Sequence, residues 1–288
     1  MDFYSPRSWA EALELKGEHP DALPITGGTD VMVELNFNRH RPLALLDLSA
    51  VPELKDWGQV DGHLRVGAGV SYARLVRELG ARLPGLAIAA RTVGSPQIRN
   101  RGTVGGNLGS ASPAGDAHPP LLAGRASVEL ASVRGTRQVA VEEFFTGPKR
   151  SVLASDELIS AFVVRPAPGP EQFCKVGTRN AMVIAVASFA ISLDPGQGRV
   201  GTGVGSAAPT PRRARAAEEF LEGELAAAGM WEHPRSLPDG LVSRFAELAV
   251  AAASPIDDVR GTAAYRRHAL AVMARRALSW AWADLMRD

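Results

Sequence analysis

The spacing of apolar and polar residues changes repeatedly along the first 164 positions. Apolar residues recur at helical spacing in residues 6–17 and 72–79, and residues 86–92 show the same pattern. Short apolar runs typical of buried strands separate these stretches. They occupy residues 23–26, 44–47, 64–67 and 158–164, and residues 128–131 and 136–141 form a predicted hairpin that turns at Gly135. This part of the chain is therefore expected to mix helices with strands.

The pattern changes after a proline-rich segment at residues 165–170, Arg-Pro-Ala-Pro-Gly-Pro. Proline stiffens the backbone and removes hydrogen-bond donors, so this segment is the expected domain boundary, near residue 168. Two predicted strands and three predicted helices follow, an order typical of an α+β unit. They cover residues 185–193, 199–206, 213–221, 241–253 and 263–285. We therefore expect domains at 1–168 and 172–288.

Charge and cysteine content exclude several classes of protein. The chain has 32 Lys+Arg against 31 Asp+Glu, a net charge of +1, whereas a nucleic-acid groove needs a concentrated basic face. The basic runs at 212–215 and 266–267 are interpreted as solvated helix faces rather than a phosphate-binding patch. Cys174 is the single cysteine, so an internal disulfide, a self-contained iron–sulfur cluster and a cysteine zinc site are all excluded. No metal site is predicted in this chain.

The first residues and the longest apolar stretch bear on location. Residues 1–6 lack the basic start and apolar core of a secretory signal. The longest uncharged apolar stretch, residues 182–193, is shorter than the roughly 20 residues that cross a bilayer. We expect a cytoplasmic protein without a membrane span.

The first candidate site is the segment Pro-Ile-Thr-Gly-Gly-Thr-Asp at residues 24–30. A strand that runs into paired glycines lets backbone N–H groups approach an anion closely. Thr26 and Thr29 add hydroxyl donors, and no lysine or arginine lies in the segment. The alternative is a tight turn in which Asp30 caps the next helix.

The second candidate site, residues 97–119, is richer in glycine and hydroxyl groups. It offers donors from Thr103, Asn107 and Ser110, and Asp116 is an acceptor suited to a ribose or ribityl hydroxyl. A bare loop of this length would be costly in entropy and would expose unpaired backbone groups, whereas a bound ligand would explain both the composition and the length of the segment. The alternative is a buried loop that satisfies its own hydrogen bonds.

Other motifs do not reach a known fingerprint. Residues 201–206 and 67–72 each lack the last glycine of the G-x-G-x-x-G dinucleotide motif. Neither a Walker sequence nor His-Glu-x-x-His occurs, and His118 is interpreted as a surface or structural residue.

Together the two glycine segments resemble those of the FAD-binding medium subunit of the carbon monoxide dehydrogenase and xanthine dehydrogenase family, the molybdenum hydroxylases. The counterparts of its two loops are Thr-Gly-Gly-Thr-Asp at 26–30 and Thr-Val-Gly-Gly-Asn at 103–107. Further resemblances follow in order along nearly the whole chain. They lie at 98–102, 110–119, 144–148, 156–159, 173–179, 255–261 and 265–267.

This resemblance implies an α+β fold, a two-subdomain FAD-binding domain of the vanillyl-alcohol-oxidase (PCMH) type followed by a small α+β C-terminal domain. The subdomains would cover about 1–54 and 55–168. It also implies the residues that contact FAD. These are Ile25, Thr26, Gly27, Gly28, Thr29, Asp30, Thr103, Gly106, Asn107, Ser110 and Asp116, with Leu158 and Lys175 on the flavin side.

The implied function is that of the flavoprotein subunit of a molybdenum-containing oxidoreductase, assembled as a heterotrimer or a pair of heterotrimers. A large subunit with a molybdenum cofactor and a small subunit with [2Fe–2S] clusters would be the partners, and NAD, a quinone or a carrier protein the external acceptor. No residue of this chain would act as a catalytic acid or base on the organic substrate. Three alternatives stand beside this: a stand-alone flavoprotein oxidase or dehydrogenase, a flavin-free binding protein and an NAD-dependent enzyme.

Overall fold

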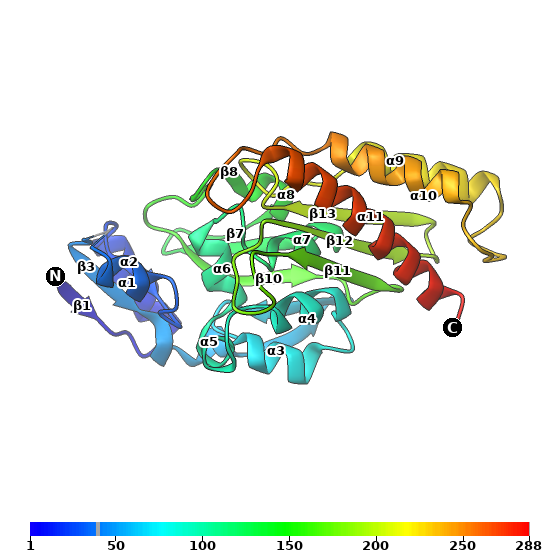
Figure 1. Cartoon of the computed structure of the whole chain (residues 1–288). Helices are drawn as coiled ribbons and strands as arrows, with labels where there is room; N and C mark the ends of the chain where they lie inside the picture. Colours follow the sequence, from blue (N-terminus) through cyan, green and yellow to red (C-terminus); the bar gives the residue numbers. More distant parts are fainter. Residues whose placement is uncertain (39–40, 288) are drawn as a thin grey trace.

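The computed structural model describes residues 1–38 and 41–287. The chain begins with a small three-stranded parallel sheet in the order β1-β3-β2, which lies at one end of the molecule (Figure 1). Its elements are β1 (Asp2–Tyr4), α1 (Trp9–Glu18), β2 (Leu23–Ile25), α2 (Val31–Asn36) and β3 (Ala44–Asp47). Ser8 sets the start of α1, because its hydroxyl accepts a hydrogen bond from the Glu11 N–H. The sequence pattern missed β1, which is three residues long and mostly exposed.

The second sheet has five antiparallel strands in the order β4-β5-β10-β6-β7. They are β4 (Trp57–Val60), β5 (His63–Gly67), β6 (Ser127–Ser132), β7 (Gly135–Ala140) and β10 (Leu158–Val164). The predicted hairpin is confirmed as the pair β6–β7. Two 3-10 turns precede β4, and α8 with the short pair β8–β9 precedes β10. They span Leu48–Ala50, Pro52–Lys55, Val141–Phe144 (α8), Phe145–Gly147 (β8) and Arg150–Ser151 (β9).

Five helices connect β5 to β6. They are α3 (Tyr72–Leu79), α4 (Pro84–Arg91), α5 (Pro96–Arg101), α6 (Val104–Ser110) and α7 (His118–Ala123). The second glycine-rich segment is thus largely helical, and its interpretation as one long loop was wrong. Ser95 caps α5 and Thr103 caps α6, because each hydroxyl accepts a hydrogen bond from an N–H in the first turn of its helix. In α6 this cap offsets part of the low helix propensity of the glycines.

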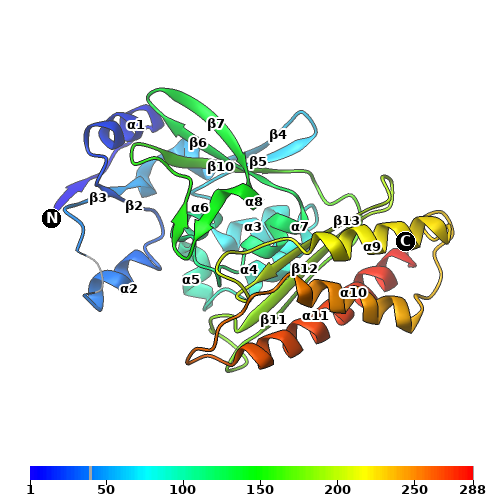
Figure 2. The same cartoon turned by 90° about the horizontal axis from the view of Figure 1, so that it is seen from above.

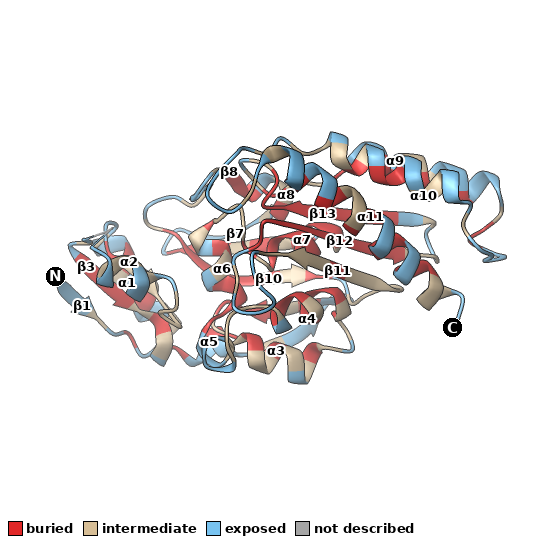
Figure 3. Ribbon diagram, in the orientation of Figure 1, coloured by how far each residue is buried: buried red, intermediate tan, exposed pale blue. Residues whose placement is uncertain are grey.

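The third sheet is an antiparallel meander. It consists of β11 (Glu171–Val176), β12 (Ala187–Asp194) and β13 (Arg199–Gly205). Three helices cover one face of this sheet, while α4 and α7 cover the other (Figures 1 and 2). These three are α9 (Arg215–Ala227), α10 (Asp239–Ala251) and α11 (Ala263–Leu285). Consistent with this sandwich, β12 and β13 are buried almost throughout (Figure 3).

The apolar side chains form two main clusters. One includes buried residues from Ala12 to Val164 and joins the first two sheets, and the other runs from Ala187 to Trp282. Because the first cluster ends at Val164 and the second begins at Ala187, we propose that the chain divides near residue 168, with the part before it built of two subdomains around one core. No helix within residues 1–38 and 41–287 is long and apolar enough to cross a membrane.

The glycines of β13 explain how closely the two parts pack. A Cβ atom at Gly201 would overlap the carbonyl of Ala123 in α7, and one at Gly203 would overlap the carbonyl of Pro119. Alternate residues of a strand point to the same face, so these glycines form a flat strip against which α7 lies. The repeated glycines at 201–205 therefore serve close packing of β13 on α7.

Glu171 makes the contact between β11 and α4, at the same interface between the two parts of the chain, sensitive to pH. Its carboxylate accepts a hydrogen bond from the Gly85 N–H at the start of α4, with 2.9 Å between N and Oε2. Burial raises the pKa of Glu171 to about 7, although the bonds from Gly85 and Ser192 lower it. The native state therefore binds the extra proton, and the stability that this group contributes is lost as pH rises from about 4.5 through 7.

Replacing Glu171 by glutamine is therefore expected to stabilise the protein at pH 8 by about 1–3 kcal/mol and to have little effect at pH 5. The amide oxygen of glutamine can still accept the hydrogen bond from Gly85. Urea denaturation at both pH values measures the difference, with the exposed Glu14→Gln as the control. A similar effect of Glu171→Gln at both pH values would contradict the assignment.

Candidate functional site

The two glycine-rich segments lie against each other. A Cβ atom at Gly27 would overlap the carbonyl of Arg101, so the first segment passes directly over the end of α5. Ser71, which directly precedes α3, forms an antiparallel β-bridge with Thr103 of the second segment. The structure therefore brings together the two segments that the sequence singled out.

The first segment is shaped by its backbone. Gly28 has φ of 74°, in the left-handed region that glycine adopts readily. Asp30 directly precedes α2, but its side chain makes no capping hydrogen bond, so the capping alternative is not what the structure shows. Burial, and then the charge of Glu34, raise the pKa of the Asp30 carboxyl. The remaining predicted contacts Ile25, Thr26 and Thr29 are each half-buried along the same turn.

The second segment presents one open face of α6. Gly106, Asn107 and Ser110 lie on this face, while Val104, Gly105 and Leu108 are buried. The adjacent glycines Gly105 and Gly106 differ in the space around them. A Cβ atom at Gly105 would lie 2.5 Å from the Ala68 Cβ and carbonyl oxygen. A Cβ atom at Gly106 would lie 3.1 Å from the Thr103 Oγ1, and no other atom of the described residues outside the α6 backbone would lie within 4 Å. Gly105 is required for packing, and Gly106 keeps the open face free.

Asn107 is hydrogen-bonded to the start of α7, on the side away from the open face. Its side-chain oxygen accepts a hydrogen bond from the Ala117 N–H at 3.2 Å, and its backbone oxygen lies 3.1 Å from His118 Nε2. His118 is completely buried, and burial lowers its pKa to about 4, so the ring is neutral near pH 7. His118 is thus a structural residue. The Asn107 amide nitrogen has no hydrogen-bond partner within the described chain, so it is available to a ligand.

Asp116 and Lys175 form a buried ion pair between the two parts of the chain. The Lys175 Nζ lies 2.6 Å from Asp116 Oδ2 and also donates to the Thr92 carbonyl oxygen. The side chain of Lys175 is 5% exposed and that of Asp116 is 11% exposed. Burial raises the pKa of Asp116 to about 6, against the opposing effect of Lys175. Asp116 Oδ1 is buried and has no partner among the described residues, which leaves one acceptor unmatched.

Leu158 lies deeper than the other predicted contacts. It is 2% exposed and belongs to the core of the first part of the chain. Its neighbour Ile159 reaches α6, where its Cδ1 would lie 3.7 Å from a Cβ atom at Gly109. A flavin-side role for Leu158 stays a prediction.

The two basic runs are not simply solvated helix faces, and that interpretation was wrong. Arg266 is 3% exposed and donates to the carbonyl oxygens of Val186 and Ser206, and its guanidinium lies 2.6 Å from Asp258. Charge spacing along one segment could not show this, because the partners come from other parts of the chain.

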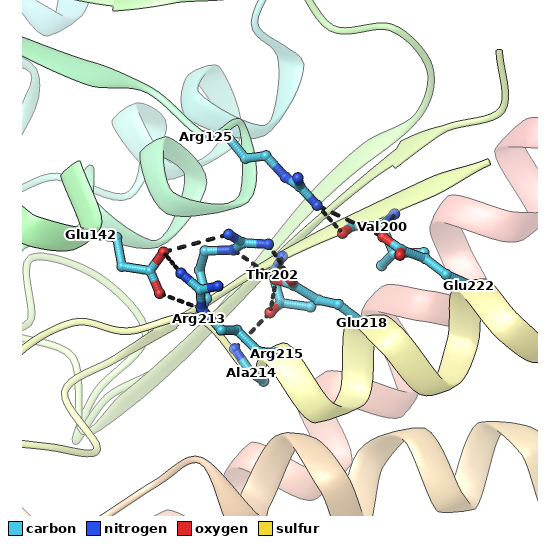
Figure 4. A network of polar contacts seen from close by, with 9 residues as sticks. All are labelled: Arg125, Glu142, Val200, Thr202, Arg213, Ala214, Arg215, Glu218 and Glu222. Carbon is cyan, nitrogen blue, oxygen red and sulfur yellow. Dashed lines mark hydrogen bonds and ion pairs between the residues drawn. The ribbon is translucent and has the colours of Figure 1, made fainter. Parts of the chain in front are cut away.

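The other basic run also links the two parts (Figure 4). Arg213 lies between Glu218 of α9 and Glu142 of α8, and Arg215 contacts the same Glu142. Glu218 also accepts hydrogen bonds from the N–H and hydroxyl of Thr202, both at 2.7 Å. The charges of Arg213 and Arg215 are therefore matched by carboxylates of this chain.

The residues at the meeting point of the two segments fit a dinucleotide cofactor such as FAD. The open face of α6 gives it room, the Asn107 amide is a free donor, and Asp116 Oδ1 is a free buried acceptor. An unmatched buried oxygen is costly, and a ligand hydroxyl would satisfy it.

Comparison with known proteins agrees with this geometry. Residues 1–167 match the family model of the FAD-binding domain in molybdopterin dehydrogenase, and residues 172–281 match that of the CO dehydrogenase flavoprotein C-terminal domain. The chain belongs to this family of flavoprotein subunits. It has the α+β fold expected from the sequence, a FAD-binding domain followed by a C-terminal domain, and FAD is its cofactor.

Relatives match the chain over nearly its whole length. The putative xanthine dehydrogenase FAD-binding subunit of Escherichia coli is 30% identical over 96% of this chain and 94% of its own. The medium chain of carbon monoxide dehydrogenase from Hydrogenophaga pseudoflava is 29% identical over 98% of this chain and 97% of its own length. In a solved structure of the latter enzyme, one chain superposes with a TM-score of 0.88 over 99% of this chain and 98% of its own. The flavoprotein is therefore an oxidoreductase subunit, as expected.

FAD affinity is expected to depend on the ionisation of Asp116. A charged carboxylate accepts a stronger hydrogen bond from a ligand hydroxyl, so affinity should fall as pH drops through about 6. The folding stability of the FAD-free protein should depend on pH in the opposite direction. Because the pKa of Asp116 is raised, the stability that this group contributes is lost as pH rises from 3.8 through about 6. Asp116→Asn should bind FAD roughly tenfold more weakly at pH 8 and show no such pH dependence. Fluorescence titration measures this, with the exposed Asp61→Asn as control, and a persistent pH dependence in Asp116→Asn would refute the assignment.

Proposed function

We propose that this flavoprotein is the electron-transfer subunit of a molybdenum hydroxylase complex. It would take electrons from [2Fe–2S] clusters of a small partner subunit and pass them to an external acceptor such as NAD, a quinone or a carrier protein. A large subunit with a molybdenum cofactor would act on the organic substrate. Bound FAD supplies the redox chemistry, and the residues of this chain supply binding and position. A cytoplasmic location and a heterotrimeric assembly stay predictions.

The observation that carries this proposal is the single cysteine in a chain so similar to medium subunits. A cluster typically needs about four cysteine ligands, so this chain cannot hold one alone. The relatives are named as subunits or medium chains of carbon monoxide, xanthine and nicotinate dehydrogenases. Electrons for the bound flavin would therefore come from another polypeptide.

Within the chain, we propose separate tasks for the two segments. Residues 25–30 and the open face of α6 would bind the polar middle of FAD through backbone N–H groups, Thr103, Asn107 and Ser110. Asp116, aligned by Lys175, would accept a hydrogen bond from a ribose or ribityl hydroxyl. Each of these groups would bind or orient the cofactor, and none would act as an acid or base on an organic substrate.

The test uses the purified full chain alone and together with its two partner subunits. Its visible spectrum and the nucleotide released by heating should identify bound FAD. The flavin of the chain alone should stay oxidised with purines, nicotinate or carbon monoxide under anaerobic conditions. It should be reduced in the complex by the substrate of that complex. Reduction of the isolated chain by a small substrate would instead identify a stand-alone dehydrogenase.

A further inference from the structure

Tyr72 lies where the two glycine-rich segments meet, yet its hydroxyl is unused. The residue begins α3, is 3% exposed, and its backbone N–H donates to the Gly102 carbonyl oxygen at 2.9 Å. A Cβ atom at Gly102 would lie 3.5 Å from the Tyr72 ring and 3.4 Å from the Thr29 hydroxyl. The ring is therefore next to both segments. Its buried hydroxyl has no hydrogen-bond partner among the described residues.

The phenol also lies within the electrostatic influence of both carboxylates of the site. Burial, and then the negative charges of Asp116 and Asp30, raise the pKa of Tyr72 well above its usual value. The phenol therefore stays protonated at neutral pH and is a hydrogen-bond donor. Asp116 Oδ1, which is also buried without a partner among the described residues, is an acceptor.

An unmatched buried donor and an unmatched buried acceptor in one site restrict what can bind between them. A sugar-type hydroxyl can accept one hydrogen bond and donate another, so it can satisfy both atoms. A phosphate oxygen only accepts, and it would be repelled by the carboxylate. We propose that Tyr72 is a further cofactor-binding residue, whose phenol donates a hydrogen bond to a ribityl or ribose hydroxyl of FAD that in turn donates to Asp116. This inference rests on the placement of FAD at the two segments.

The first experiment measures FAD binding and thermal stability of full-length Tyr72→Phe. Phenylalanine keeps the ring, so the apoprotein should melt at or above the wild-type temperature, because it loses only an unmatched hydroxyl. FAD should bind about 3- to 10-fold more weakly, the effect of one hydrogen bond. Tyr4→Phe, in which the ring stacked on His19 is kept, is the matched control and should bind FAD normally.

Two outcomes would overturn the inference. Unchanged FAD affinity in Tyr72→Phe would show that the phenol makes no contact with the cofactor. A lower melting temperature of the apoprotein would show that the hydroxyl has a structural partner within the protein. Neither outcome would affect FAD binding by the wild-type chain, so failure here is distinct from failure of the proposed function.

The source of the hydroxyl is found by repeating the titration with ADP and 2′,3′-dideoxy-ADP in competition with FAD. If Tyr72→Phe weakens FAD but not ADP, the hydroxyl belongs to the ribityl chain. If it weakens ADP but not the dideoxy analogue, the hydroxyl belongs to the adenosine ribose. Equal weakening of both adenine nucleotides would indicate a phosphate contact and would refute a hydroxyl between Tyr72 and Asp116.

Discussion

Gly106→Val is expected to abolish FAD retention while the protein remains folded. Apart from the backbone of α6 itself, only the Thr103 hydroxyl among the described residues lies within 4 Å of a Cβ atom at this position, so the added side chain enters the open face of α6 rather than the core. If FAD lies on that face, the side chain should weaken binding roughly a hundredfold, equivalent to about 3 kcal/mol of steric conflict. The melting temperature of the apoprotein should change little, because valine is no worse than glycine in a helix.

The adjacent residue supplies the contrast. Gly105→Ala adds a single carbon but directs it at the backbone of Ala68, so it should destabilise the apoprotein by about 1–3 kcal/mol. Gly28→Val is a poorer probe, since its φ of 74° would strain any branched residue whether or not FAD is bound. Calorimetry of the apoproteins and FAD titration together separate these effects. Normal FAD content in Gly106→Val would remove α6 from the binding site.

The two glycine-rich segments were easier to single out from the sequence than their secondary structure was. Four predicted contacts of the second segment, Thr103, Gly106, Asn107 and Ser110, have the spacing of one helical face. The structure places the last three on the open face of α6 and Thr103 at its N-cap. The segment was nevertheless interpreted as a loop, because its glycines disfavour a helix. The Thr103 cap and the packing of Gly105 on Ala68 stabilise the helix, and neither appears in a local pattern.

Contacts between distant elements were the least predictable part. Lys175 was suggested by resemblance alone, and nothing in the spacing of β11 indicates that it pairs with Asp116. The strand itself was missed because its residues are mostly half-buried, without the continuous apolar run of β12. Arg213 and Arg266 looked like surface charges for the same reason, since their partners lie on other elements. Local patterns therefore identified the β6–β7 hairpin and the glycine segments, but not the interface behind them.

That interface should control both stability and cofactor binding, and Gly203→Ala tests this. The new methyl group would overlap the Pro119 carbonyl, so β13 could no longer lie flat on α7. Two contacts with the FAD segment cross the same interface, the Ser206 N–H to Pro113 oxygen bond at 2.8 Å and the Lys175–Asp116 pair. We expect a loss of about 3 kcal/mol in unfolding free energy, together with weaker FAD binding.

For a chain of this size, that loss lowers the melting temperature by roughly 6–12 °C, and saturating FAD should recover part of it. Gly223→Ala is the control, because no atom of the described residues outside its own helix backbone lies within 4 Å of a Cβ atom there, and alanine favours the helix. It should raise the melting temperature slightly and leave FAD binding unchanged. If Gly203→Ala lost stability but kept normal FAD affinity, the C-terminal domain would only cover the nucleotide site, and Lys175 would not align Asp116. A parallel loss of both means that the FAD site is complete only when β11 and β13 are packed on the first domain.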